Sequence, residues 1–391
     1  MLALAALTLV SPLVGATTYP LLESWSGSNF FNGFKNDPST YDNTTNGDVF
    51  WAGTQNTSLL YVNDAGRVIM KVDNTTSVAY NDKRYAPKLL SKTSYNVGTV
   101  WVMDAVHMPY GCSVWPALWT QGSNWPQGGE IDIMEGINLQ TTDQIALHTE
   151  GSGCLASTAT TSGSSLTYNN CSIGANSDSG CTYNVTNANS YGAGFAAAGG
   201  GVYVAEFASS GVKVWFLTRS AVPSSLTSSA SSLDTSTLGT PVAEYDSSGC
   251  DISQYFTSQT LTIDITLCGT WAGVASLLEE TCPPLVGTNT CYTTYVINDA
   301  ETTYANAYFE INYINVYSNS TTSAANSSSG SSSGTSATKT NTIGASGTGS
   351  ASASTSKSAA RSFKSWEGAG TGMGWVYTAG MAVLGGLAMV L

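Results

Sequence analysis

The sequence predicts an all-β domain, a sandwich of two packed antiparallel sheets. Short runs of β-branched and aromatic residues recur along the chain, and Asn, Asp or Gly bounds them, as in strands joined by turns. The 391 residues include 40 Gly and 11 Pro, and no long stretch has the period of an amphipathic helix. A parallel α/β sheet needs helical crossovers, so these features favour a sandwich or jelly roll.

About a dozen stretches have the composition of strands. In order they are residues 49–52, 58–62, 67–72, 86–91, 98–106, 114–120, 130–135, 144–149, 201–207, 212–217, 261–266 and 307–317. Pro116 has no amide proton, so it argues against a well-paired central strand at 114–120 and for an edge or a bulge. Residues 151–200 are too polar for a core, and we expect long loops tied by disulfides there.

The two ends of the chain differ in composition from the domain at 17–317. Residues 1–16 are apolar and end in small residues, which predicts a secretory signal peptide rather than a buried first strand. Residues 318–358 are Ser-, Thr- and Gly-rich and predict a disordered stalk. Residues 359–391 form a polar spacer and an apolar tail, the pattern of a removed glycosylphosphatidylinositol-anchor signal with attachment at Ser358.

This arrangement predicts a secreted protein held at the cell surface or wall by a lipid anchor. The alternative for the tail is a transmembrane helix, which the absence of following basic residues disfavours. Seven Asn-x-Ser/Thr sequons are candidate glycan sites. They begin at Asn43, Asn56, Asn74, Asn170, Asn184, Asn319 and Asn326.

Charge and cysteine content exclude some kinds of partner. The net charge of −13 argues against nucleic acid, which requires clustered Lys and Arg, and the hydroxyl- and amide-rich surface suits a neutral substrate. The eight cysteines contain no CxxC pair, so we expect no zinc site and up to four disulfides. The connectivity stays open; Cys171–Cys181 and Cys282–Cys291 are candidates because they are close in sequence.

One stretch, residues 128–136, concentrates carboxylates in a chain with few charges. It reads Gly-Gly-Glu-Ile-Asp-Ile-Met-Glu-Gly and predicts a strand. Glu130 and Asp132 then share a face, whereas Glu135 points to the opposite face. One extra residue in a bulge, most simply at Met134, would return Glu135 to the first face and complete a row of three acids.

Three neighbouring acids indicate either a metal site or catalysis by acid, base and nucleophile, because like charges at close range perturb each other's pKa. Calcium and magnesium usually take oxygen ligands from loops rather than from one strand. Glycoside hydrolysis instead needs two carboxyl groups, one ionised and one protonated. The residues themselves leave open which acid has which role.

The acid stretch resembles the signature of glycoside hydrolase family 16 in its bulged E-x-D-x-x-E form. The resemblance covers about residues 20–317 and is greatest to fungal secreted endo-1,3(4)-β-glucanases of the laminarinase type. It extends to Trp115–Thr120, Asn124–Pro126, Asn138–Thr142, Leu147–Thr149 and Leu267–Gly273. It implies a β-jelly-roll sandwich with a concave glycan-binding cleft and a retaining hydrolase. Carried onto this chain, it implies Glu130 as nucleophile, Glu135 as general acid/base, and Asp132 as a partner that separates their pKa values.

Five further residues are candidate substrate contacts. Trp115 and Trp119 share a strand face, and their aromatic rings suit either sugar stacking or the core. Trp125 lies in the loop entering the acid stretch, which favours a substrate role. His148 either assists the acids from a neighbouring strand or is structural. Asn138 either lines the cleft or ends the strand.

The leading hypothesis is an endo-acting β-glucanase that cleaves 1,3 or mixed 1,3/1,4 linkages. A cell-wall glucan transglycosylase is the first alternative, although such enzymes resemble the shorter E-x-D-x-E form. A non-catalytic glucan-binding surface protein is the second, and the three acids weigh against it. We expect no metal or other cofactor, a monomer, β-glucan as the partner, no nucleic acid, and contact with a membrane only through the lipid anchor.

Overall fold

The computed structural model of the chain describes residues 18–157, 161–297 and 300–320. The predicted signal peptide, most of the predicted stalk and the predicted anchor signal lie outside these residues. Within the described ranges, no helix has the length and apolar character needed to cross a bilayer. The first strand begins at Thr18 and the last ends at Ser318.

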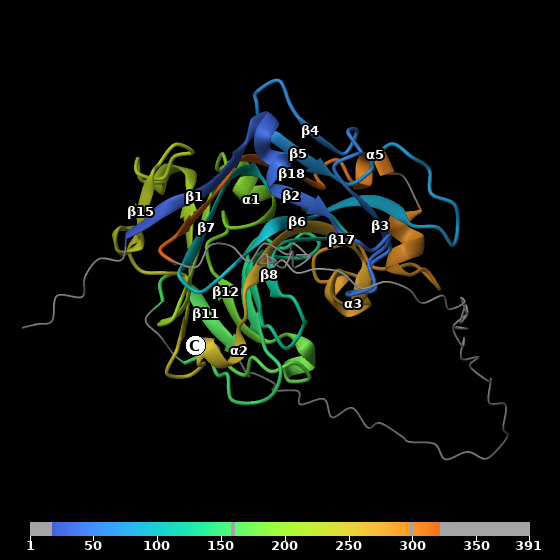
Figure 1. Ribbon diagram of the computed structural model, residues 1–391. Helices are drawn as coiled ribbons and strands as arrows, with labels where there is room; N and C mark the ends of the chain where they lie inside the picture. Colours follow the sequence, from blue (N-terminus) through green and yellow to red (C-terminus); the bar gives the residue numbers. More distant parts are fainter. Residues whose placement is uncertain (1–17, 158–160, 298–299, 321–391) are drawn as a thin grey trace, which may run out of the picture. The chain divides into compact units, whose positions relative to one another are not determined.

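Two sheets of nine described strands each make up the domain (Figure 1). The first sheet has the order β15 (Ser232–Asp234), β1 (Thr18–Ser26), β18 (Tyr308–Ser318), β7 (Thr99–His107), β13 (Gly201–Ala208), β14 (Gly211–Thr218) and β16 (Ala243–Asp246); β5 (Val68–Lys71) pairs with β18, and β4 (Leu60–Val62) pairs with β5. The second sheet has the order β11 (Ser164–Tyr168), β12 (Cys181–Val185), β10 (Gln144–His148), β9 (Glu130–Glu135), β8 (Val114–Gly122), β17 (Gln259–Leu267), β6 (Arg84–Tyr95) and β2 (Phe34–Asn36), with β3 (Val49–Ala52) parallel to β6.

The described helices are all short and lie in the connections. They are α1 (Gly192–Ala197), α2 (Ile252–Tyr255), α3 (Gly269–Ala272), α4 (Ala275–Leu278), α5 (Ala300–Thr303), the 3-10 helices η1 (Gly27–Gly33), η2 (Asn176–Asp178), η3 (Arg219–Ala221) and η4 (Thr235–Leu238), and the π-helical turn η5 (Tyr292–Val296). The prediction of an all-β sandwich of two antiparallel sheets is confirmed, and each predicted strand overlaps an observed one.

The prediction of loops for residues 151–200 is wrong in part. This region contributes β11 and β12 to the edge of the second sheet, and α1 follows them. Several of its large apolar residues, among them Tyr183 and Phe195, are fully buried against the core. A strand at a sheet edge needs only a few such anchors, so its polar composition concealed it.

The main hydrophobic core lies between the sheets, and strand alternation determines what each outer face carries. In β7, Trp101 and Met103 point into this core, whereas Val100 and Val102 point the other way into a second apolar cluster. Leu226, Leu233 and Leu238 of the β14–β16 connection cover that second cluster. The outer face of the first sheet is therefore covered, and the polar residues of β9 lie on the outer face of the second sheet.

Pro116 lies in an interior strand, because β8 pairs with both β9 and β17. The expectation of an edge position is wrong. Pro116 pairs with Ile265 of β17, but the ladder to β9 ends one residue later, at Ala117. The missing amide proton therefore removes no hydrogen bond from the β9 ladder.

All eight cysteines form disulfides: Cys112–Cys282, Cys154–Cys250, Cys171–Cys181 and Cys268–Cys291. The Cys171–Cys181 prediction is confirmed, and the Cys282–Cys291 prediction is wrong. Both cysteines of the rejected pair bond instead to residues that flank β8 and β17. Proximity in the sheet, rather than in the sequence, determines these two bridges.

Candidate active site

The acid stretch forms β9, and a bulge in it brings the three acids to one face. Asp132 pairs with Trp119 of β8, and Glu135 pairs with Ala117, so the register between these pairs shifts by one residue. Met134 pairs with Leu118, which leaves Ile133 as the inserted residue. The predicted bulge is present, but it lies at Ile133 rather than Met134. Both side chains point into the core, where the extra apolar residue is stabilised by burial.

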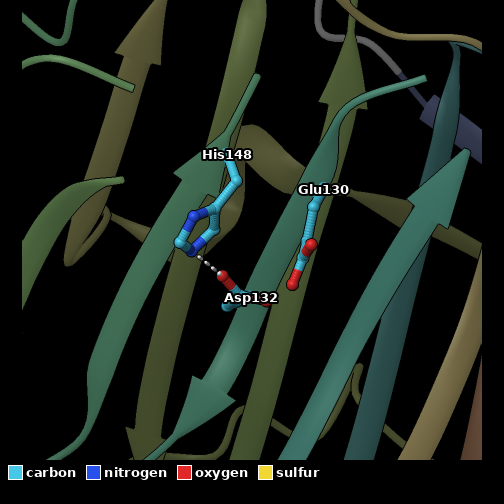
Figure 2. A group of neighbouring side chains, drawn as sticks. All are labelled: Glu130, Asp132 and His148. Atoms are coloured by element: carbon cyan, nitrogen blue, oxygen red, sulfur yellow. Dashed lines mark ion pairs between the residues drawn. The ribbon is translucent and has the colours of Figure 1, made fainter. Parts of the chain in front are cut away.

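The register explains how neighbouring strands supply partners to the acids. On β10, Ala146 lies opposite Asp132, and His148 lies opposite Glu130. The small Ala146 side chain leaves space over Asp132, and His148 reaches into it, with His148 Nε2 3.1 Å from Asp132 Oδ2. Figure 2 shows Asp132 between His148 and Glu130. The sequence alternatives for His148 are thus decided in favour of contact with the acids.

Tryptophan N–H groups contact both glutamates. Trp115 Nε1 donates to Glu135 Oε1 at 2.7 Å, and Trp125 Nε1 donates to Glu130 Oε2. Trp125 is 51% exposed, so about half of the residue is open to a ligand. Neither the Trp115 ring nor the Trp125 ring belongs to the hydrophobic core, and both lie at the acid face.

The third predicted tryptophan, Trp119, lies on the same face of β8. Its Nε1 donates to Asp264 Oδ1 of β17 at 3.1 Å. Lys88 Nζ lies 5.5 Å from the Trp119 ring centroid and 5.0 Å from that of Trp51. The core alternative for Trp119 is therefore rejected, because polar groups surround its ring.

Burial raises the pKa of both glutamates, and Asp132 raises them further by repulsion. The pKa of Glu130 reaches about 8, and that of Glu135 lies well above its usual range. His148 opposes the rise at both glutamates, and so does one tryptophan N–H at each, from Trp125 at Glu130 and from Trp115 at Glu135. The positive charge of protonated His148 lies opposite Glu130 in the row. Glu130 therefore ionises more readily, and Glu135 retains its proton.

The His148 imidazole is held in its protonated form. Burial lowers the pKa of His148, but the hydrogen bond and the charge of Asp132, with the charges of the two glutamates, outweigh burial and raise the pKa to about 9. Asp132 is only 2% exposed, so it requires this cation as a partner. Glu130, Asp132 and His148 have ligand atoms within 4.8 Å of one another and could hold a cation by geometry. The protonated imidazole opposes this use.

Asn138 does not reach the acid face, which corrects its predicted substrate contact. It is fully buried at the turn after β9, with a backbone φ of 57°. Its Oδ1 accepts the Ser113 amide proton at 2.8 Å, and its Nδ2 donates to the Ala272 carbonyl at 3.2 Å. Asn138 therefore ends the strand and joins three segments of backbone.

The structure also brings residues to the site that the sequence did not single out. Trp271 of α3 packs edge-on against Trp115, with ring centroids 5.4 Å apart. Lys88, which lies 3.4 Å from Asp37, and Asp264 extend the polar face beyond Trp119. Burial raises the pKa of Asp264 to about 7, although Lys88 opposes the rise. The sequence did point to Trp271, because it lies in Leu267–Gly273, one of the stretches that resemble the family.

Known proteins are similar to this chain in sequence and fold. Residues 36–317 match the family model described as an XgeA-like, catalytic GH16 domain. A probable endo-1,3(4)-β-glucanase of Aspergillus fumigatus is 37% identical over 337 residues, which cover 82% of this chain and 50% of the relative. The chain thus spans about half the length of the curated relatives that it matches.

Solved structures agree with the sequence comparison. Laminarinase 16A of Phanerochaete chrysosporium, with β-glucans bound in donor and acceptor sites, has a TM-score of 0.71 and 35% identity. An elongating family 16 β-1,3-glucosyltransferase has a TM-score of 0.70 and 35% identity. Each alignment covers 77% of this chain and 100% of the solved chain. With its two sheets and its bulged row of acids, the chain belongs to glycoside hydrolase family 16.

Proposed function

We propose that the protein is an endo-acting, retaining β-glucanase that hydrolyses 1,3 or mixed 1,3/1,4-β-glucans. The observation that carries this proposal is the row on β9, where a bulge aligns Glu130, Asp132 and Glu135 on an outer sheet face. The relatives named above as endo-1,3(4)-β-glucanase and laminarinase support the substrate class.

Glu130 is the nucleophile in this proposal and Glu135 is the general acid/base. His148 favours the anion of Glu130, and burial keeps the proton on Glu135. Glu135 gives this proton to the glycosidic oxygen as that bond breaks, and Glu130 forms a bond to the anomeric carbon. Ionised Glu135 then takes a proton from water, whose oxygen displaces Glu130 with net retention.

The Asp132–His148 pair keeps the row of acids from ionising as three equal groups. Asp132 is paired with His148, so its anion is matched by a cation, while its repulsion acts on both glutamates. Because His148 lies opposite Glu130, Glu130 ionises before Glu135 as the pH rises. This difference is what a retaining mechanism requires.

The outer face of the second sheet would carry the glucan chain. Trp125 offers an exposed ring beside Glu130, and Trp115 and Trp119 lie along β8 next to the acids. Aromatic rings bury the apolar faces of sugars, while their N–H groups orient neighbouring carboxylates. A glucan lying across these strands would extend past both sides of the acids, which fits cleavage within a chain.

Glucan transfer is a second candidate reaction. The glucosyltransferase of known structure is as similar to this chain as the laminarinase. Transfer and hydrolysis share the glucosyl-enzyme formed on Glu130, and they differ only in whether water or a sugar hydroxyl accepts the glucosyl group. We place hydrolysis first because the curated relatives carry glucanase names.

Purified protein incubated with laminarin, lichenan and labelled short acceptors tests these proposals. Hydrolysis gives new reducing ends, transfer gives long labelled chains, and a binding protein gives neither. Glu130→Gln and Glu135→Gln should each lower kcat by at least about 100-fold. Glu244→Gln, in β16 of the other sheet, should leave it unchanged. Full activity in both site variants would refute the assigned roles.

We also propose that the protein is secreted as a monomer and held at the cell surface or wall by a lipid anchor. The four disulfides support an oxidising compartment. The terminal compositions described above support the signal peptide and the anchor. Release of the protein from intact cells by a phospholipase C specific for such anchors tests this; retention in the cytoplasm contradicts it.

A further inference from the structure

Behind Glu135, on the side away from the acid face, lies an acid that the mechanism above does not use. Asp143, just before β10, is 1% exposed. Its Oδ1 accepts the backbone amide proton of Glu135 at 2.9 Å. Its Oδ2 is buried and has no hydrogen-bond partner among the described residues. A buried carboxylate oxygen without a donor is costly, so the ionised form fits this site poorly.

Asp143 is itself held rigidly by backbone bonds. Its amide donates to Ser190 Oγ at 2.9 Å, and its carbonyl accepts from the Val185 amide at 2.9 Å. The Tyr203 hydroxyl is the neighbouring polar group, and it donates its one proton to the Ser190 carbonyl at 2.6 Å. What Tyr203 can offer Asp143 is therefore a lone pair, and only a protonated carboxyl can donate to it.

The electrostatic surroundings of Asp143 also favour the neutral acid. Burial raises its pKa well above the usual range and Asp132 raises it further, and together they outweigh the lowering by the Glu135 and Gln144 amides and the Tyr203 hydroxyl. Besides the acids of β9, the titratable groups acting on it are the hydroxyls of Tyr191, Tyr203 and Tyr245. Within the described part of the chain, the charged side chain that acts on Asp143 is thus another acid, Asp132.

We propose that Asp143 is a positioning residue that holds the end of the bulge as a neutral acid, with Oδ1 on the Glu135 amide and its proton on Oδ2 towards Tyr203. Glu135 faces the other acids only because of the bulge at Ile133, so its backbone must be fixed where the bulge ends. The backbone is also held closely at the next position. A Cβ at Gly136 would lie 2.9 Å from the Tyr191 ring, so the chain there packs directly against that ring.

This inference rests on the proposed function, since it assigns Asp143 to the position of the general acid/base. A neutral carboxyl at this site also avoids a further negative charge beside Asp132 and Glu135. An amide has the same shape as a protonated carboxyl, with one acceptor and one donor group. Asn should therefore replace Asp143, and Ala should not.

The first test compares Asp143→Asn with Asp143→Ala on laminarin. Asp143→Asn should keep kcat within about threefold of wild type, and Asp143→Ala should lower kcat about 10- to 100-fold with a smaller change in KM. The loss in Asp143→Ala should shrink with an aryl β-glucoside whose leaving group needs no protonation, because the defect lies at Glu135. Wild-type kcat in Asp143→Ala, or an equal loss in Asp143→Asn, would overturn the proposal.

The second test needs no activity and uses two variants that keep the side-chain volume. Infrared difference spectra of wild type against Asp143→Asn at pH 6–7 should contain the C=O stretch of a protonated carboxyl. The control is the difference spectrum of wild type against Glu244→Gln, which should contain a carboxylate signal instead. A carboxylate signal from Asp143 would overturn the neutral acid. If wild type cleaves no β-glucan, the proposed function fails, and this spectrum still decides where the proton of Asp143 lies.

Discussion

Replacing His148 with Gln should lower the stability of the protein by an amount that depends on pH in a defined direction. The wild-type imidazolium lies 3.1 Å from Asp132, and its side chain is 15% exposed. Gln is neutral but still offers an N–H donor to Asp132. The variant therefore removes the charge of the pair while keeping much of its hydrogen bonding.

The magnitude follows from the pKa of His148, which rises from 6.5 to about 9 on folding. A rise of one unit in pKa corresponds to about 1.4 kcal/mol, so the pair contributes about 3 kcal/mol to the free energy of unfolding. Because the pKa is higher in the folded state, this stabilisation is complete below pH 6.5 and is lost as the pH rises through 9. A loss of this size lowers the Tm by roughly 5–10 °C in a domain of this length.

Thermal unfolding of wild type and His148→Gln between pH 5.5 and pH 10 measures this effect. The only other histidine, His107, provides a matched control. Burial lowers the pKa of His107, so its protonation destabilises the fold as the pH falls. The stability lost in His107→Gln should therefore shrink towards acid pH, whereas that lost in His148→Gln should shrink towards alkaline pH.

Two results would refute this reasoning. One is a difference in Tm between wild type and His148→Gln that is the same at pH 6 and pH 10. The other is an unchanged acid limb in the pH profile of kcat/KM. Because His148 lowers the pKa of Glu130, its loss should move that limb to higher pH.

Three further predictions separate the scaffold from the site. Asn138→Ala leaves buried backbone groups unpaired, so the free energy of unfolding should fall by about 2 kcal/mol. KM for laminarin should stay unchanged, and a raised KM would restore Asn138 as a substrate contact. Trp115→Phe removes the N–H that lowers the pKa of Glu135, so the basic limb of the kcat profile should move to higher pH; no movement would contradict the hydrogen bond. Cys112→Ser combined with Cys282→Ser opens a bridge spanning 170 residues and should lower the free energy of unfolding by about 2–5 kcal/mol. An unchanged midpoint of denaturant unfolding would contradict this.

Part of the site follows from the period of a strand. Side chains alternate along β9, so Glu130 and Asp132 must share a face, and Glu135 can join them only through an inserted residue. The need for a bulge was therefore predictable from six residues of sequence, 130–135. Its place at Ile133 was not, because the register depends on Leu118 and Trp119 in another strand.

The sequence by itself determined the all-β class, the row of acids and the family, because these depend on local alternation and on motifs. The tertiary structure alone decided which side chains meet the acids: His148 over Ala146, Trp115 on Glu135, and Asp143 behind it. It also removed Asn138 from the substrate face by burying it. The physical reason is that such contacts depend on strand order and register, which join residues distant in sequence and leave no periodic pattern along the chain.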